Sequence, residues 1–187
     1  MHRLRGGNRG VGIANGRGGA ESKTRAAYMR RLAGEILTGD PAETFRSNEM
    51  GRGHEMEPEI RSYYSMVNDV DVKQVGFVRN GRIGCSPDGL VGDKGAVEFK
   101  SKKPEVLIEV LQKKELPSEH KAQVHSILMV TEREWVDFMA YWPKMPKFET
   151  RVYRDEVYIA SLRRGVSQFY EELDALVDML RNYGMAA

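Results

Sequence analysis

The sequence predicts a mixed α/β (α+β) protein, in which helices flank a central mixed β-sheet. Three features predict this class. Segments with helical periodicity precede the strand-like segments and follow them. Short strand-like segments, separated by turns that contain glycine, lie between them. No unit of about 20 to 50 residues repeats along the chain, which argues against a solenoid or a propeller.

Two helices are predicted before the first strand. The first covers about residues 22–37, with Ser22 as its N-cap, and ends at Gly39-Asp40-Pro41. The second covers residues 47–67 and carries apolar residues on one side. Because proline has no backbone N–H, we expect a kink or a fresh start of this helix near Pro58.

Strands are predicted in the middle of the chain. Residues 75–78, 82–85 and 96–100 have strand composition, and the turns Asn80-Gly81 and Gly92–Gly95 separate them. This order predicts a three-stranded antiparallel meander.

The remaining elements are a helix, two strands and a final helix. The helix is predicted to follow Pro117-Ser118 and to run to Val130, and the strands cover residues 135–141 and 148–153. The last helix carries apolar residues spaced three and four apart, which is most simply a core or an interhelical seam. These residues are Leu162, Val166, Phe169, Leu173, Leu176 and Leu180.

The first twenty residues differ in composition from the rest. Residues 1–19 contain seven glycines and four arginines and no acidic residue. Such a segment cannot form a core, so residues 1–20 are predicted to be a flexible basic arm. It either becomes ordered on a partner or is a terminus without a role. Residues 21–187 are predicted to form a single domain.

Composition restricts the chemistry. The chain has 187 residues, of which 41% are hydrophobic and 30% charged, and its net charge is only +2. A role in nucleic-acid binding therefore needs a local basic patch. The single cysteine, Cys85, cannot form an internal disulfide or, within one chain, a cysteine-based zinc or iron–sulfur site.

The sequence predicts a cytoplasmic protein without a membrane segment. Its N-terminus is basic but lacks the apolar stretch of a signal peptide. The longest clearly apolar run, Ile127–Val130, is far too short to cross a bilayer. A single cysteine also fits a reducing compartment.

The predicted strand over residues 96–100 carries charges on one face. Side chains alternate along a strand, so Val97 and Phe99 share one face, and Glu98 and Lys100 share the other. The apolar face is expected to be buried. The charged face is compatible with plain solvent exposure.

Asp88 makes a second interpretation possible. The turn at residues 92–95 folds the chain back and brings Asp88 near Glu98, and two close carboxylates tolerate each other best with a cation between them. Such an oxygen-rich site suits Mg²⁺ or Mn²⁺. The backbone carbonyl of Phe99 is a further candidate ligand. Lys100 would polarise a metal-bound water or contact a phosphate oxygen, which is the chemistry of phosphodiester hydrolysis.

The spacing of these residues resembles a known signature. Pro87-Asp88, nine residues, then Glu98-x-Lys100 is the pattern of the PD-(D/E)XK nuclease superfamily. Within it, the sequence resembles the phage lambda exonuclease family, also called YqaJ-type viral recombinases. The resemblance covers about residues 26–182. It is carried, in order, by Tyr28–Glu35, Gly53–Tyr64, Ser86–Val91, Glu98–Lys100, Ala122–His125 and Trp135–Pro143.

The resemblance implies a restriction-endonuclease-like core and assigns the site residues. Asp88 and Glu98 match the metal-binding carboxylates, and Lys100 matches the catalytic lysine. Glu57 matches a helical glutamate that completes the acidic cluster. Gln123 matches a helix glutamine at the edge of the active site.

The residues alone leave alternatives open for the helical positions. Glu57 is also an ordinary i,i+4 partner for Arg61 on a helix surface. Glu55 or Glu59 replaces it as a ligand if the helix kinks. Three further candidates, His54, His120 and His125, lack the spacing of a zinc motif and are expected at the surface or as phosphate contacts.

A basic rim around the acidic centre would let a DNA backbone approach despite the small net charge. Lys102 and Lys103 directly follow the catalytic strand, and Lys121 lies on the glutamine helix. Lys113 and Lys114, which precede that helix, are equally interpretable as a solvated charged face.

The arginine that family members place near the DNA 5′ phosphate has no clear counterpart. The corresponding stretch, Arg9–Gly16, is at best an eroded version of the family pattern. Arg9 and Arg17 are the two candidates for this DNA contact. The weak match affects the expectation of end selectivity and 5′-to-3′ polarity more than the expectation of hydrolysis itself.

The resemblance implies a Mg²⁺-dependent 5′-to-3′ exonuclease that acts on linear double-stranded DNA in phage-type recombination. It also implies a homotrimer, a single-strand annealing protein as partner, and a phage or prophage gene expressed in a bacterial host. The alternatives are an endonuclease of the same superfamily and a catalytically inactive DNA-binding or assembly module.

Overall fold

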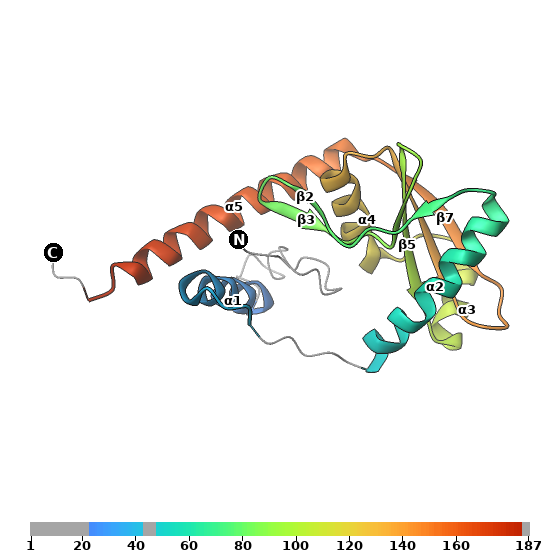
Figure 1. Cartoon of the computed structure of the whole chain (residues 1–187), viewed down its shortest axis with the longest axis horizontal. Coiled ribbons are helices and arrows are strands. Elements are labelled where there is room, and N and C mark those ends of the chain that lie inside the picture. Colours follow the sequence, from blue (N-terminus) through green and yellow to red (C-terminus); the bar gives the residue numbers. More distant parts are fainter. Residues whose placement is uncertain (1–22, 43–47, 185–187) are drawn as a thin grey trace. The chain divides into compact units, whose positions relative to one another are not determined.

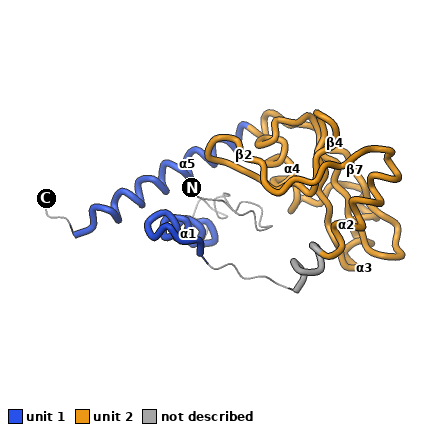
Figure 2. The backbone as a smooth tube through the Cα atoms, viewed as in Figure 1, with its two compact units in different colours: residues 1–45, 160–187 blue, residues 46–159 orange. Residues whose placement is uncertain are grey.

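The computed structural model describes residues 23–42 and 48–184, with the backbone alone for residues 48–54. The chain divides into two compact units (Figure 2), one from Met1–Phe45 with Ala160–Ala187 and the other from Arg46–Ile159. The predicted arm lies outside the described residues. The single domain over residues 21–187 stays a prediction.

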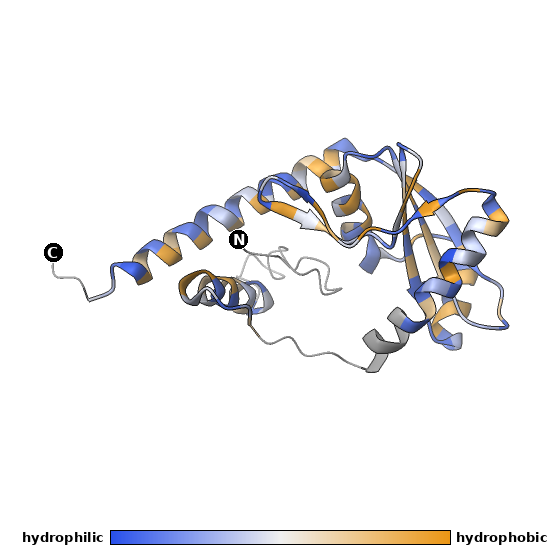
Figure 3. Ribbon diagram, in the orientation of Figure 1, coloured by the Kyte–Doolittle hydropathy of each residue, from blue (hydrophilic) through white to orange (hydrophobic). Residues whose placement is uncertain are grey.

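The first unit contains a pair of helices. In it, α1 (Lys23–Thr38) packs against the larger part of α5 (Glu156–Arg181). Phe169, Leu173 and Leu176 of the predicted stripe lie in this interhelical seam, whereas Leu180 is exposed. Hydrophobic and hydrophilic bands alternate along α5 in Figure 3. Arg25 is buried at the seam, forms a 2.6 Å ion pair with Glu172 and lies 5.2 Å from the ring centroid of Phe169. The buried core consists of Met29, Leu32, Ala33, Phe169, Leu173 and Val177.

The second unit is built on a five-stranded mixed sheet in the order β1-β4-β5-β6-β7 (Figure 1), which confirms the predicted fold class. β5 and β6 are parallel, and the other neighbours are antiparallel. A parallel pair requires a crossover, which two helices supply here. The strands are β1 (Val72–Lys73), β4 (Gly89–Val91), β5 (Gly95–Ser101), β6 (Trp135–Tyr141) and β7 (Phe148–Tyr153), and the helices are α2 (Asn48–Asn68), α3 (Pro104–Lys113) and α4 (Ser118–Thr131).

The predicted three-stranded meander is wrong. β2 (Val78–Asn80) and β3 (Ile83–Cys85) form a hairpin that is a separate two-stranded sheet. The turn at Gly81 has the expected positive φ, +59°. β5 pairs instead with β4 and β6. Alternation along a strand predicts its two faces but not its neighbours, and this is why the pattern misplaces the hairpin.

One helix, α3, is absent from the sequence prediction. Pro104 stands in its first turn, where a missing N–H costs no hydrogen bond, and Lys114 ends it in the left-handed conformation. Leu107 and Val110 are buried on one side of it. A proline followed by apolar residues three apart was the available signal.

Helices lie on both faces of the sheet, with α2 and α4 on either side of β5 in Figure 1. On one face, the ring of Tyr64 in α2 lies 5.8 Å from that of Phe99. On the other, the ring of His120 in α4 lies 5.0 Å from that of Phe138. Because side chains alternate along β5, Glu98 is on the α4 side.

α2 continues through Pro58 as one helix, so the fresh start expected there is not observed. Among the described helices, none combines the length and the apolar composition that a membrane span requires.

A buried carboxylate ties α2 to the sheet. Asp137 of β6 accepts a 2.6 Å hydrogen bond from the Tyr64 hydroxyl and a 2.8 Å hydrogen bond from Arg151 Nε. Burial, followed by this hydrogen bond, raises the pKa of Tyr64. The guanidinium of Arg151 stacks 3.7 Å above the ring of Trp135. Because Tyr64 and Arg151 both donate to it, the buried charge of Asp137 is compensated, and its role is structural.

Candidate active site

The hairpin of β4 and β5 brings the two predicted carboxylates together. Gly89 pairs with Val97, so the next step of the register places Asp88 opposite Glu98. Asp88 N–H donates to Val97 O at 3.2 Å, and Phe99 N–H donates to Asp88 Oδ2 at 2.6 Å. Residues directly opposite in an antiparallel pair point to the same face, which the sequence analysis predicted for this pair.

Two contacts hold the hairpin in place. Gly89 follows Asp88 where β1 passes closely, and a Cβ at this position would lie only 2.3 Å from Val72 Cγ1. At the turn, Arg133 Nη1 donates to the carbonyls of Gly92 and Gly95, each at 2.7 Å. The backbone that joins the two carboxylates is therefore held by residues outside the hairpin.

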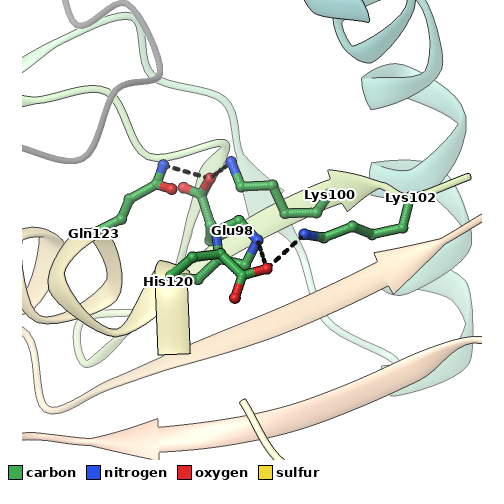
Figure 4. Close-up of polar contacts among 6 residues, drawn as sticks. Glu98, Lys100, Lys102, His120 and Gln123 are labelled. Carbon is green, nitrogen blue, oxygen red and sulfur yellow. Dashed lines mark hydrogen bonds and ion pairs between the residues drawn. The ribbon is translucent and has the colours of Figure 1, made fainter. Parts of the chain in front are cut away.

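Glu98 is the centre of the site (Figure 4). Its side chain is 2% exposed, and its Oε1 accepts a 2.7 Å hydrogen bond from Gln123 Nε2 and an ion pair from Lys100 Nζ. Its other oxygen, Oε2, is buried and has no hydrogen-bond partner among the described residues. An unpartnered buried carboxylate oxygen is costly unless a further ligand is present.

The two carboxylates disfavour each other's ionisation. Burial and, next, the charge of Glu98 raise the pKa of Asp88 well above its usual range. Burial also raises the pKa of Glu98, against the opposing effect of Lys100. Glu57 raises both pKa values further. Such mutual destabilisation is the electrostatic condition in which a bound cation is most favourable.

Glu57 is close enough to act on these charges but is itself engaged. Its carboxylate forms an i,i+4 ion pair with Arg61, the alternative that the sequence left open. Arg61 also reaches the hairpin, where its Nε donates to Asp88 O at 3.2 Å. This arginine therefore links α2 to the hairpin, a role that the sequence analysis did not assign.

The residues present fit a divalent cation held by few protein ligands. The donors are hard carboxylate oxygens, and one of them is buried with no hydrogen-bond partner in the described residues. In the part of the chain that the structure describes, no three His, Cys, Asp or Glu side chains are grouped closely enough to hold a metal on their own. Water and backbone carbonyl oxygens would therefore have to complete the shell. The ligand set Asp88, Glu98, Phe99 and Glu57, and the ion Mg²⁺ or Mn²⁺, stay predictions.

The histidines do not lie where the sequence analysis expected them. His125 is buried, with its Nδ1 2.9 Å from Lys121 O. The His120 side chain is 12% exposed, and its Nε2 lies 3.7 Å from Glu119 Oε1. This nitrogen is buried and has no hydrogen-bond partner among the described residues. Burial, then the charges of Lys102 and Lys100, lower the pKa of His120 to about 4.

The predicted basic residues divide into two groups. Lys102 lies beside the site and forms a 3.1 Å ion pair with Glu119, and the exposed Lys103 follows it. Lys121 points elsewhere on α4, with its Nζ 4.6 Å from the ring centroid of Tyr158. Lys113 is an exposed partner of Glu109, which fits the solvated-face interpretation.

Several predicted residues fall outside the described side chains. These are Arg9, Arg17 and His54. The sequence analysis did not identify Glu119 and Arg61 as residues that contact the site. It expected His120 at the surface or as a phosphate contact. Their sequence signal is only helical spacing, since Glu119 and His120 lie three to four positions before Gln123.

The fold and the site define the class of protein. A mixed sheet whose central hairpin carries Asp88, Glu98 and Lys100 is the arrangement of a PD-(D/E)XK nuclease. The model of the YqaJ-like viral recombinase domain matches residues 4–134. The chain therefore belongs to the YqaJ-like viral recombinase family.

Solved structures agree with this assignment. The chain is 31% identical to an alkaline exonuclease, LHK-Exo, from Laribacter hongkongensis, with a TM-score of 0.82 over 93% of this chain and 89% of that chain. LHK-Exo in complex with dAMP matches at 33% identity and a TM-score of 0.79, over 87% and 86% of the two chains.

A more distant likeness shows the fold alone. A phage related exonuclease from Haemophilus somnus 129PT is 14% identical, with a TM-score of 0.65 over 91% of this chain and 92% of that chain. No curated protein sequence matches the chain.

Proposed function

We propose that this protein is a Mg²⁺- or Mn²⁺-dependent exonuclease that hydrolyses phosphodiester bonds of linear double-stranded DNA. The observation that carries the proposal is the pair of the half-buried Asp88 and the buried Glu98, with Lys100 beside it. Within the described part of the chain, Glu98 Oε2 has no hydrogen-bond partner. Membership of the YqaJ-like viral recombinase family and the likeness to an alkaline exonuclease support the reaction class.

Asp88 and Glu98 are the proposed cation ligands, with the Phe99 carbonyl and Glu57 as the other predicted donors. A divalent ion, when bound there, would lower the pKa of a water and neutralise negative charge on the phosphate. Phe99 N–H donates to Asp88 Oδ2 and holds this oxygen in place. The other carboxylate oxygen, Oδ1, is therefore the one that we propose as the cation ligand.

Lys100 is the positively charged side chain that the protein itself contributes to the site. Its side chain is 11% exposed and is held by Glu98 Oε1. From this position it would contact the attacking water or a non-bridging phosphate oxygen, where a cation stabilises the charge that develops. Gln123 donates to the same oxygen and so fixes the carboxylate plane of Glu98.

Lys102, Lys103 and Lys121 are the proposed phosphate contacts, together with Arg9 and Arg17. Lys102 is the most direct candidate because it directly follows β5, the strand that carries Glu98 and Lys100. A phosphate would have to replace Glu119 as its partner.

The finer functional assignments extend the family resemblance. We propose 5′-to-3′ resection of DNA ends for phage-type recombination in a bacterial cytoplasm, together with a single-strand annealing protein. We also propose a homotrimer. Sedimentation equilibrium tests the oligomer directly, and a monomer at micromolar concentration would contradict it.

The activity is tested with two DNA substrates. End-labelled linear duplex, with or without a 5′ phosphate, and covalently closed circles are incubated with Mg²⁺, with Mn²⁺ or with EDTA. Release of mononucleotides from ends only, abolished by EDTA, supports the exonuclease. Label placed at the 5′ or the 3′ end determines the polarity.

The other outcomes identify the alternatives. Cleavage of closed circles would indicate an endonuclease of the same superfamily. Binding of DNA without hydrolysis under any metal condition would indicate an inactive binding or assembly module, and would contradict the proposed function.

A further inference from the structure

We propose that Lys102 and His120 together bind a backbone phosphate of the DNA, and that the carboxylate of Glu119 occupies this phosphate site when DNA is absent. Glu119 is thus an internal competitor that the DNA displaces. The proposal rests on the proposed nuclease function, because the phosphate belongs to the same substrate.

Three side chains meet at the proposed phosphate site. Lys102 directly follows β5, and Glu119 and His120 stand in the first turn of α4. A single carboxylate oxygen, Glu119 Oε1, lies 3.1 Å from Lys102 Nζ and 3.7 Å from His120 Nε2. The lysine and the imidazole therefore point to one position from two different elements (Figure 4). That position already holds an anionic oxygen.

His120 presents a hydrogen-bonding atom that the described residues leave unused. Its Nε2 is buried and has no partner among them, since 3.7 Å is too long for a hydrogen bond to Glu119. A buried polar atom without a partner indicates a ligand that is not yet bound. A phosphate has several oxygens, so it can accept from Lys102 and from an Nε2–H group at once.

Glu119 is the one of the three side chains that can leave. It is 59% exposed, whereas the side chains of Lys102 and His120 are 15% and 12% exposed. The ring of His120 also packs against Phe138, with 5.0 Å between the centroids. Exposed side chains change rotamer rapidly, and an ion pair with an exposed partner adds little stability. DNA can therefore displace the carboxylate while the two donors stay in place.

The phosphate at this site differs from the one that is cleaved. Lys102 N–H donates to Tyr141 O at 3.1 Å, so the ladder of β5 extends to this residue. Because side chains on one face of a strand recur every second residue, Lys102 follows Glu98 and Lys100 on the same face, roughly 7 Å beyond Lys100. Lys100 serves the phosphate at the carboxylates, and Lys102 serves a neighbouring phosphate.

The test measures the Kd for linear duplex in EDTA, where the DNA stays intact. Glu119→Gln should lower this Kd by about two- to fivefold, because the DNA no longer has to break an ion pair. Lys102→Met should raise it by about tenfold or more, the usual effect of losing a charged donor. Adding Glu119→Gln to Lys102→Met should leave the Kd nearly unchanged, since Glu119 competes for the lysine.

A second glutamate in a first helical turn provides the matched control. Glu105 is exposed in the first turn of α3, and Glu105→Gln removes the same charge three residues from Lys102. Its Kd should equal that of the wild type. An equal gain in both variants, or an unchanged Kd in Glu119→Gln, would overturn the proposal. A lower Tm of Glu119→Gln without tighter binding would identify the ion pair as structural and would also overturn it.

A further measurement uses inorganic phosphate and needs no DNA. The ring resonances of His120, assigned by their loss in His120→Phe, are followed by NMR during a phosphate titration at constant pH, with chloride of equal ionic strength as the control. They should shift at a lower phosphate concentration in Glu119→Gln than in the wild type, and should not shift in Lys102→Met. An absent shift in Glu119→Gln would overturn the phosphate site, whereas a wild type that hydrolysed no DNA would overturn the proposed function alone.

Discussion

At the scale of single residues, the site depends on the different surroundings of the two carboxylate oxygens of Glu98. One of its oxygens is bound by Lys100 and Gln123, and the other is buried with no partner among the residues that the structure describes. The carboxylate is thus held in a fixed plane while one of its oxygens is left for a ligand. Asp88 is arranged similarly, since Phe99 N–H fixes its Oδ2.

Asp88→Ala is expected to lower DNA cleavage by at least about 10³-fold, because it removes one of the two carboxylates that the hairpin contributes to the site. DNA binding in EDTA should survive, since the basic residues are untouched. Gel-shift and end-label assays measure the two properties. Asp93→Ala, in the exposed turn between β4 and β5, is the matched control and should retain full activity. Retained turnover in Asp88→Ala would remove the site assignment.

The raised pKa values of Asp88 and Glu98 predict how stability depends on pH in the absence of metal. Above the unfolded-state pKa, the folded state holds more protons than the unfolded state, so the free energy of unfolding falls as pH rises through the raised pKa values. In EDTA, Glu98→Gln should therefore be more stable than the wild type at pH 8, by on the order of 1 kcal/mol or a Tm increase of about 2–4 °C.

Calorimetry at several pH values checks this dependence. Mg²⁺ should raise the Tm of the wild type and leave that of Glu98→Gln nearly unchanged, since only the carboxylate binds it well. The difference between the two proteins in EDTA should disappear near pH 4. A variant less stable than the wild type at pH 8 would contradict the assigned direction of the pKa shift.

At the scale of elements, the hairpin of β4 and β5 positions the site because residues outside it hold its turn. Arg133, which follows α4, donates to the turn carbonyls, and Gly89 allows the close approach of β1. The register then sets the separation of the carboxylates. An exposed hairpin without these contacts would be free to fray.

Arg133→Met should destabilise the protein by about 1.5–3 kcal/mol, the usual contribution of a charged hydrogen-bond donor. Because the turn controls the register, the cleavage rate should fall as well. Lys94→Met is the control, since Lys94 forms only an exposed ion pair with Glu134. Chemical denaturation and the end-label assay measure both effects. Equal stability in the two variants would show that the turn does not need Arg133.

At the scale of the whole molecule, positive charge is local rather than general. The net charge is +2, yet residues 1–19 carry four arginines and no acid. Removal of residues 1–20 should weaken DNA binding and reduce the slope of log K against log salt by at least about 0.9, the contribution of one phosphate contact. Titrations at several salt concentrations measure this slope. An unchanged affinity and slope would identify the segment as a terminus without a role in DNA binding.

The sequence by itself determined the chemistry of the hairpin. The spacing of Asp88, Glu98 and Lys100, with a turn between the acids, predicted that the chain folds back there and brings the carboxylates near each other, and alternation along the strand placed Glu98 and Lys100 on one face. Local periodicity likewise predicted the seam on α5. These properties depend on neighbours in sequence, so the sequence contains them.

Only the tertiary structure decided which elements meet. It made β5 the parallel neighbour of β6, separated the β2–β3 hairpin from the main sheet, and placed the ring of His120 against that of Phe138. It also raised the carboxylate pKa values, since desolvation depends on what packs around a group. Contacts between distant segments follow from packing of the whole chain, and local patterns do not contain them.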